Sequence, residues 1–195
     1  MSSGYAILKK MCSLADHEAH EETFSEDIPL EQVEAAFLAH TDRSGGTDLY
    51  ALEALRLADR ELGGKWRVVQ LSRKELINIV LPPHRHGKPK NFTPLIPPPG
   101  LSLDDTLERL AVMPEYSRVN PQCWSSLITA AEDHSPIYLA SQPVSIPDHE
   151  GFGVFVGHNL FHLDGLHRLV GKGIIYGFSD HELAENPVIA YIAGE

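Results

Sequence analysis

The sequence predicts an α+β fold in which helices pack on a small mixed β-sheet. Residues 154–163 alternate apolar and polar side chains, as two short strands joined by a turn do. Apolar residues then recur at helical spacing across residues 166–170, and residues 187–193 return to a β-branched run. Helical patterns precede this part, in residues 29–62. Strands, a helix and a closing strand, with helices before them, are the basis of the prediction.

The chain divides into an acidic arm, residues 1–28, and one α+β domain, residues 29–195. The arm is weakly patterned, and its acidic residues around two histidines are typical of a solvated segment. Within the domain we distinguish a helical and strand extension at residues 29–81, a proline-rich loop at residues 82–100, and a core at residues 101–195.

The extension contains four predicted elements. Residues 29–40 and 47–62 carry apolar side chains at helical spacing, and the second of these helices ends at a Gly-Gly pair. Residues 66–71 form a strand pattern. A helix is expected from residue 72 through residue 80, with a capping box because Glu75 follows Ser72 by three residues.

The proline-rich loop interrupts the regular structure. Its seven prolines exclude a helix and a central strand over residues 82–100. His84, Arg85 and His86 form a compact cationic group inside it. Such a group either faces an anionic substrate or lies on a surface loop, and we include all three residues among the candidate anion-binding residues.

The core begins with two predicted helices, at residues 102–113 with Ser102 as N-cap and at residues 121–131. A strand at residues 136–140 and a polar loop at residues 142–152 lead to the strands and helix described above.

Overall composition limits the classes of protein. The chain is 43% hydrophobic and 22% charged, as in ordinary globular proteins. A formal net charge of −11 argues against nucleic-acid binding and against attachment to anionic lipid. No apolar run approaches the length of a membrane span, and Cys12 and Cys123 are too few and too far apart for a disulfide framework. We expect a cytoplasmic protein with reduced thiols, and we leave open whether it forms a homo-oligomer.

The candidate site lies where the predicted strand meets the predicted helix. Two imidazoles, a carboxylate and a guanidinium fall within seven residues there. We expect Asp164, His167 and His162 to act as acid and base, and Arg168 to bind an anionic group with backbone amides near Gly165. The predicted ligand is a small anionic substrate.

Other interpretations of these residues remain open. His162 and Asp164 match half of a non-haem iron facial triad, and His158, His162, Asp164 or His167 could hold a divalent ion, although we do not favour a metal here. Asp164 could also simply cap the following helix and pair with Arg168 four residues later.

Residues 120–194 resemble the core shared by ParB-type N-terminal domains and sulfiredoxins. The resemblance depends on Asn-Pro at 120–121, on the strands at 154–163 and on Asp-Gly-Leu-His-Arg at 164–168. It implies a turn that presents amides and an arginine to nucleotide phosphates, so a nucleotide is a candidate cofactor. The sequence departs from these families in two respects. It shows no helix-turn-helix domain after this core, and it lacks the sulfiredoxin thiol, because Cys123 is not in the matching place.

The whole chain also resembles a small family of actinobacterial proteins with a His-Leu-Asp-Gly-Leu-His-Arg signature, found here at residues 162–168. That resemblance implies a role in specialised-metabolite biosynthesis, including antibiotic biosynthesis. Three functions follow as expectations: an acid–base enzyme acting on a small anionic metabolite, a cyclase driven by proton transfer, and a non-catalytic ligand-binding accessory protein.

Overall fold

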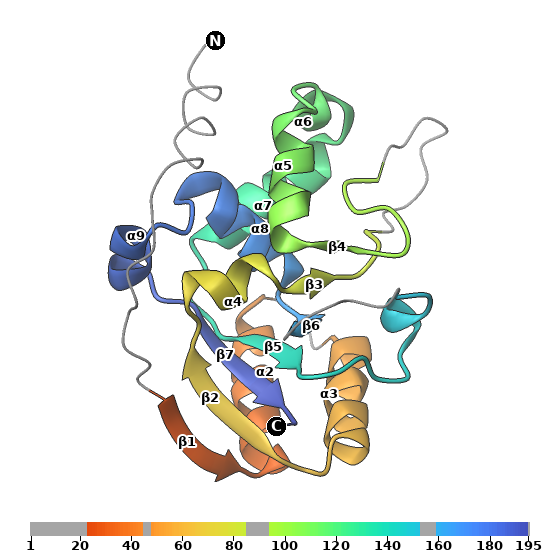
Figure 1. The fold of residues 1–195 in the computed structure, drawn as a ribbon, viewed down its shortest axis with the longest axis vertical. Helices are drawn as coiled ribbons and strands as arrows, with labels where there is room; N and C mark the ends of the chain where they lie inside the picture. The colour runs from red at the N-terminus through yellow and green to blue at the C-terminus, as the bar shows by residue number, and fades with distance from the viewer. Residues whose placement is uncertain (1–22, 45–47, 85–93, 153–158, 195) are drawn as a thin grey trace.

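The structure, a computed structural model, describes residues 23–44, 48–84, 94–152 and 159–194. It confirms the predicted α+β class, because helices pack on a mixed β-sheet (Figure 1). No helix in these residues is long and apolar enough to cross a membrane.

The described residues contribute seven strands to one sheet, in the order β1-β2-β7-β5-β6-β3-β4. Neighbouring strands are antiparallel except for the parallel pairs β5/β7 and β3/β6. The strands are β1 (Thr23–Ile28), β2 (Trp66–Gln70), β3 (Val80–Leu81), β4 (Leu101–Ser102), β5 (Ile137–Ala140), β6 (Phe161–Asp164) and β7 (Ile189–Ala193).

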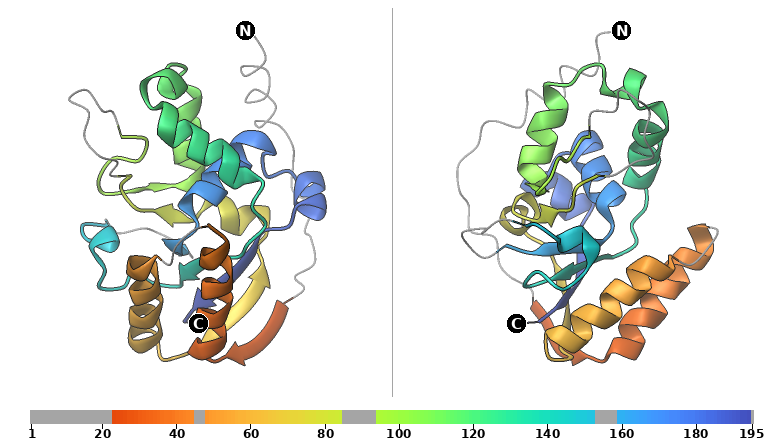
Figure 2. Two further views of the ribbon diagram at one scale, coloured as in Figure 1. Left: turned by 180° about the vertical axis from the view of Figure 1, so that it is seen from behind. Right: turned by 90° about the vertical axis from the view of Figure 1, so that its right-hand side faces the viewer.

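Helices cover both faces of the sheet. Figures 1 and 2 show α2 and α3 together on one side, with α5, α7 and α8 on the other. The helices are α2 (Leu30–Ser44), α3 (Leu49–Glu61), α4 (Arg73–Ile77), α5 (Leu103–Ala111), α6 (Tyr116–Val119), α7 (Pro121–Ala131), α8 (Leu166–Ile175) and α9 (Asp180–Glu185), with a 3-10 turn at Pro147–His149.

Helices α2 and α3 share one hydrophobic core with the sheet. Phe37 of α2 and Leu55 of α3 are fully buried against the β5 and β6 side chains Tyr138 and Phe161. The Phe37 and Tyr138 rings meet edge to face, with their centroids 5.4 Å apart. These two helices therefore form a layer on the sheet.

The opposite face holds the larger core, in which α7 and α8 pack most closely. Leu127 of α7 and Leu169 of α8 are fully buried there. Gly171 permits the close approach of the two helices, because a Cβ at this position would overlap the Leu127 carbonyl oxygen. This contact holds α7 and α8 closely side by side.

Helix caps follow the sequence, but α5 ends at Ala111 instead of residue 113, and α4 also ends earlier than predicted. Ser72 and Glu75 form the expected capping box, and Ser102 accepts the expected N-cap hydrogen bond. However, the helix predicted for residues 72–80 ends at Ile77. Val80 and Leu81 form strand β3 instead, since both side chains are buried and their backbone pairs with β4 and β6.

One further segment differs from the predictions, and the proline-rich loop, which has no helix or strand in its described residues, contacts the core more closely than expected. Residues 23–28 of the predicted solvated arm form β1, which pairs with β2 at the edge of the sheet. In the proline-rich loop, Leu95 and Ile96 are fully buried, and the Ile96 carbonyl accepts a hydrogen bond from the His84 amide. The strand predicted at residues 154–156 lies outside the described residues.

Candidate functional site

The strand-to-helix joint predicted at Asp164-Gly165 is present, and it links β6 to α8. Gly165 has φ +106°, a left-handed conformation that favours glycine. A Cβ at Gly165 would lie 2.6 Å from Cγ2 of Ile137 and 3.1 Å from Nη2 of Arg168. The missing Cβ at Gly165 therefore leaves room for the side chains of Ile137 and Arg168.

Arg168 is buried in an ionic network with two carboxylates. Its Nη2 donates to Asp164 Oδ2 at 2.6 Å and to the Pro136 carbonyl at 3.2 Å, and its Nη1 lies 3.5 Å from Asp133 Oδ2. Nη1 also contacts Nε2 of His40 on α2. The pairing of Asp164 with Arg168 is the structural alternative raised from the sequence, while helix capping by Asp164 is not observed.

Asp133 links this network to the end of α7. Burial alone would raise the pKa of its carboxyl, but hydrogen bonds from Ser135 and the nearby Arg168 and His40 outweigh burial and hold the pKa below its usual value. Asp133 is therefore a stable anionic partner for Arg168. The guanidinium is thus already engaged by protein carboxylates.

His162 lies in the sheet as a buried neutral imidazole. Neither ring nitrogen has a hydrogen-bond partner among the described residues. Burial, reinforced by His149 and Arg168, lowers its pKa to about 3. The His162 imidazole is therefore uncharged at neutral pH.

His162 and Asp164 lie beside different residues of the neighbouring strand β5. A register shift between β5 and β6 places His162 opposite Leu139, and Asp164 opposite Tyr138. Leu139 belongs to the core under α7 and α8, and Tyr138 to the core under α2 and α3. Among the described residues, no group of three metal-ligand side chains includes His162 or Asp164, so the metal site considered for these two residues is not formed there.

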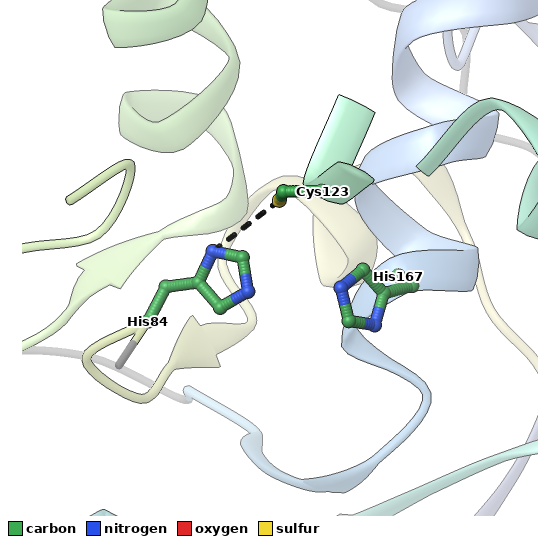
Figure 3. A group of neighbouring side chains, drawn as sticks. All are labelled: His84, Cys123 and His167. Carbon is green, nitrogen blue, oxygen red and sulfur yellow. Dashed lines mark hydrogen bonds between the residues drawn. The ribbon is translucent and has the colours of Figure 1, made fainter. Parts of the chain in front are cut away.

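A different cluster brings together His84, Cys123 and His167. Their ligand-type atoms all lie within 4.8 Å of one another, and Nδ1 of His84 is 3.9 Å from Sγ of Cys123. The His84 and His167 rings meet edge to face, with their centroids 5.4 Å apart. Figure 3 shows the three side chains directed toward one another from the loop after β3, the start of α7 and the start of α8.

The Cys123 thiol is buried and has a tyrosine donor. The Tyr116 hydroxyl donates a hydrogen bond to Sγ over 3.2 Å. Burial raises the pKa of the Cys123 thiol, although the hydrogen bond from Tyr116 acts in the opposite direction. The cluster therefore holds one thiol and two imidazoles, with His84 and Cys123 buried and His167 half-buried.

Two helix N-termini meet at this cluster. Cys123 lies in the first turn of α7, and His167 lies in the first turn of α8. Asn120 makes no side-chain cap hydrogen bond at the start of α7, and Gly165 has no side chain with which to cap α8. The first amides of both helices thus lack side-chain caps within the described residues, and such amides attract anions.

Sequence reasoning found part of this centre. His84 and His167 were predicted as site residues and meet in the cluster, whereas Cys123 and Tyr116 were missed and a metal was not favoured. Donors of this kind can transfer protons or bind a transition metal. Arg85, His86 and His158 lie outside the described residues.

The comparisons with known proteins identify a family. No curated protein and no solved structure is detectably similar to the chain. Residues 22–195, nearly the whole chain, match the family of unknown function DUF6309. The chain therefore belongs to the DUF6309 family.

Proposed function

We propose that the protein is an enzyme that acts on a small anionic metabolite at a reaction centre formed by His84, Cys123 and His167. The convergence of these three side chains carries the proposal. They come from segments far apart in the sequence, and all three can exchange protons or bind a reacting group.

The arrangement of α7 and α8 supports an anionic substrate. Both helices start at the centre without side-chain caps, so their partial positive charges and amide donors face the same space. The sequence predicts that Arg168 binds the anion with help from the amides near Gly165, and we now assign this role to the amides. Arg168, paired with Asp164 and Asp133, instead holds the first turn of α8 and so positions His167.

His162 supports a ligand beside this centre. Buried polar atoms normally have a hydrogen-bond partner, yet both ring nitrogens of His162 lack one among the described residues. His167 and Arg168 are near enough to His162 to lower its pKa. A polar ligand between these groups would satisfy the imidazole.

The biological setting is also a proposal. The resemblance to the actinobacterial family favours specialised-metabolite biosynthesis in the cytoplasm, by acid–base, transferase or cyclase chemistry. The net charge of −11 argues against duplex DNA as a partner. The alternative is an accessory protein that binds the same ligand without changing it.

A ligand panel tests the proposal. Nucleotides, inorganic phosphate, amino acids and small carboxylates are first ranked by thermal shift, and conversion of each hit is then followed by mass spectrometry. We expect turnover to be lost in Cys123→Ser and in His167→Ala, while the matched variant Cys12→Ser keeps it. Thermal melts must show that the variants fold.

The outcomes separate the alternatives. Conversion that survives in folded Cys123→Ser and His167→Ala would place the chemistry elsewhere. Ligand binding without conversion in the wild type would favour the accessory protein.

A further inference from the structure

We infer that His84, Cys123 and His167 bind one divalent transition-metal ion, of which Zn²⁺ fits best, through two imidazole nitrogens and a thiolate. The inference deepens the proposed function, since it assigns a metal to the same reaction centre. It depends on the geometry and chemistry of the three donors.

The donor distances are close to those of a coordination sphere. With Zn–S near 2.3 Å and Zn–N near 2.0–2.1 Å, sulfur and nitrogen ligands of a tetrahedral zinc lie about 3.5 Å apart. The Cys123 and His84 donors are 3.9 Å apart, and no pair in the cluster exceeds 4.8 Å. Small side-chain rotations are sufficient to close the three donors around one ion.

The chemical type of the donors selects the metal. A thiolate with two imidazoles suits Zn²⁺ and other borderline or soft ions, whereas Mg²⁺ and Ca²⁺ require oxygen ligands. Three protein ligands leave a fourth tetrahedral position for water or substrate, as in catalytic zinc sites. A metal in this position would supply a Lewis acid beside the uncapped amides of α7 and α8.

Neighbouring groups can orient the ligands. The Tyr116 hydroxyl donates to Sγ of Cys123, and a metal thiolate retains lone pairs that accept such a hydrogen bond. The His84 backbone is fixed by its amide hydrogen bond to the Ile96 carbonyl. The hydrogen bond from Tyr116 is typical of the outer shell of a metal site, and both arrangements exist without reorganisation of the fold.

The experiment uses the full chain in a Cys12→Ser background, so that Cys123 is its one thiol. Metal-free protein is titrated with Co²⁺ and, by equilibrium dialysis, with Zn²⁺. We expect one equivalent of metal, a near-ultraviolet charge-transfer band from thiolate to cobalt, and visible bands of four-coordinate intensity. Absence of the thiolate band in this folded protein overturns the inference without any further variant.

Variants assign the ligands. Removing a ligand in Cys123→Ser, His84→Ala or His167→Ala should weaken Zn²⁺ binding by more than the roughly 10–100-fold expected for loss of an outer-shell partner in Tyr116→Phe. His181→Ala, whose side chain is 76% exposed on α9, is the matched control and should bind as tightly as the parent. Equal affinity in all variants would mean that other residues bind the metal.

The two proposals fail in different ways. Metal binding without turnover on any ligand retains the metal site and rejects the enzyme. Turnover that chelators leave unchanged, in protein shown to be free of metal, retains the enzyme and rejects the metal site.

Discussion

Acidification should destabilise the folded protein through His162. This side chain is enclosed in the sheet, and neither of its ring nitrogens has a partner among the described residues. Burial, reinforced by the neighbouring His149 and Arg168, lowers its pKa from 6.5 to about 3. Between about pH 6.5 and pH 3, His162 is therefore protonated in the unfolded chain but stays neutral in the folded protein.

The sign and size of the effect follow from proton linkage. Between the two pKa values the unfolded state binds more protons than the folded state. The free energy of unfolding therefore falls by about 1.4 kcal/mol for each unit by which the pH is lowered. The contribution of His162 is complete above pH 6.5 and is lost as the pH falls toward 3. From about pH 7.5 to about pH 5, the loss amounts to about 2 kcal/mol.

Urea unfolding at both pH values measures this loss. The His162→Phe variant keeps a planar ring at this position but does not titrate, so it should lose about 2 kcal/mol less than the wild type. His149 is also buried with a lowered pKa, but it acts equally in both proteins. His181→Gln, at an exposed position, should behave like the wild type. Equal acid losses in wild type and His162→Phe would refute the reasoning.

Three further substitutions have defined outcomes. Gly165→Ala should lower the free energy of urea unfolding by about 1–3 kcal/mol, because φ is +106° and the new Cβ would lie 2.6 Å from Cγ2 of Ile137. Asp133→Asn should destabilise the protein at pH 6, because the ionised Asp133 carboxylate, whose pKa is lowered in the folded state, stabilises the fold there. The difference in free energy of unfolding between wild type and variant should shrink as the pH is lowered toward 3. Ser72→Ala should lower the melting temperature through a loss of about 1 kcal/mol, since it removes the capping box with Glu75.

Matched variants separate these effects from general damage. Gly151 also has a positive φ, +80°, but a Cβ there would meet nothing within 4 Å. Gly151→Ala should therefore cost less than Gly165→Ala, and equal costs would contradict the packing argument. Ser126 is exposed within α7 and donates to a carbonyl of its own helix, so Ser126→Ala should leave the melting temperature nearly unchanged.

Local chemistry made most secondary structure predictable from the sequence. Pro121 starts α7, which has the predicted bounds, and Ser72 with Glu75 starts α4. The end of α4 was not predictable in this way. Val80 and Leu81 continue an apolar run, and the pairing of these residues with β4 and β6 comes from distant parts of the chain.

The candidate site was predictable only where its residues are neighbours in sequence. His167 was found because it lies in a dense polar segment, and His84 because it begins a cationic group. Cys123 gave no local signal, since its spacing from Cys12 excluded a disulfide and its place beside the imidazoles depends on how α7 packs against α8. Likewise, Arg168 pairs with Asp133, which lies far from it in the sequence, and no sequence pattern connects the two residues.

The position of β7 has a consequence for how the protein folds. Ile189–Ala193 form an interior strand, antiparallel to β2 on one side and parallel to β5 on the other. A nascent chain that has reached only β6 cannot join its two halves of sheet. Strand β2 can pair with β1 early, but its second neighbour, β7, lies more than a hundred residues later in the sequence. Such non-local pairing slows folding and exposes strand edges in the meantime. We therefore expect truncations before Ile189 to aggregate during synthesis rather than to accumulate as a smaller folded unit.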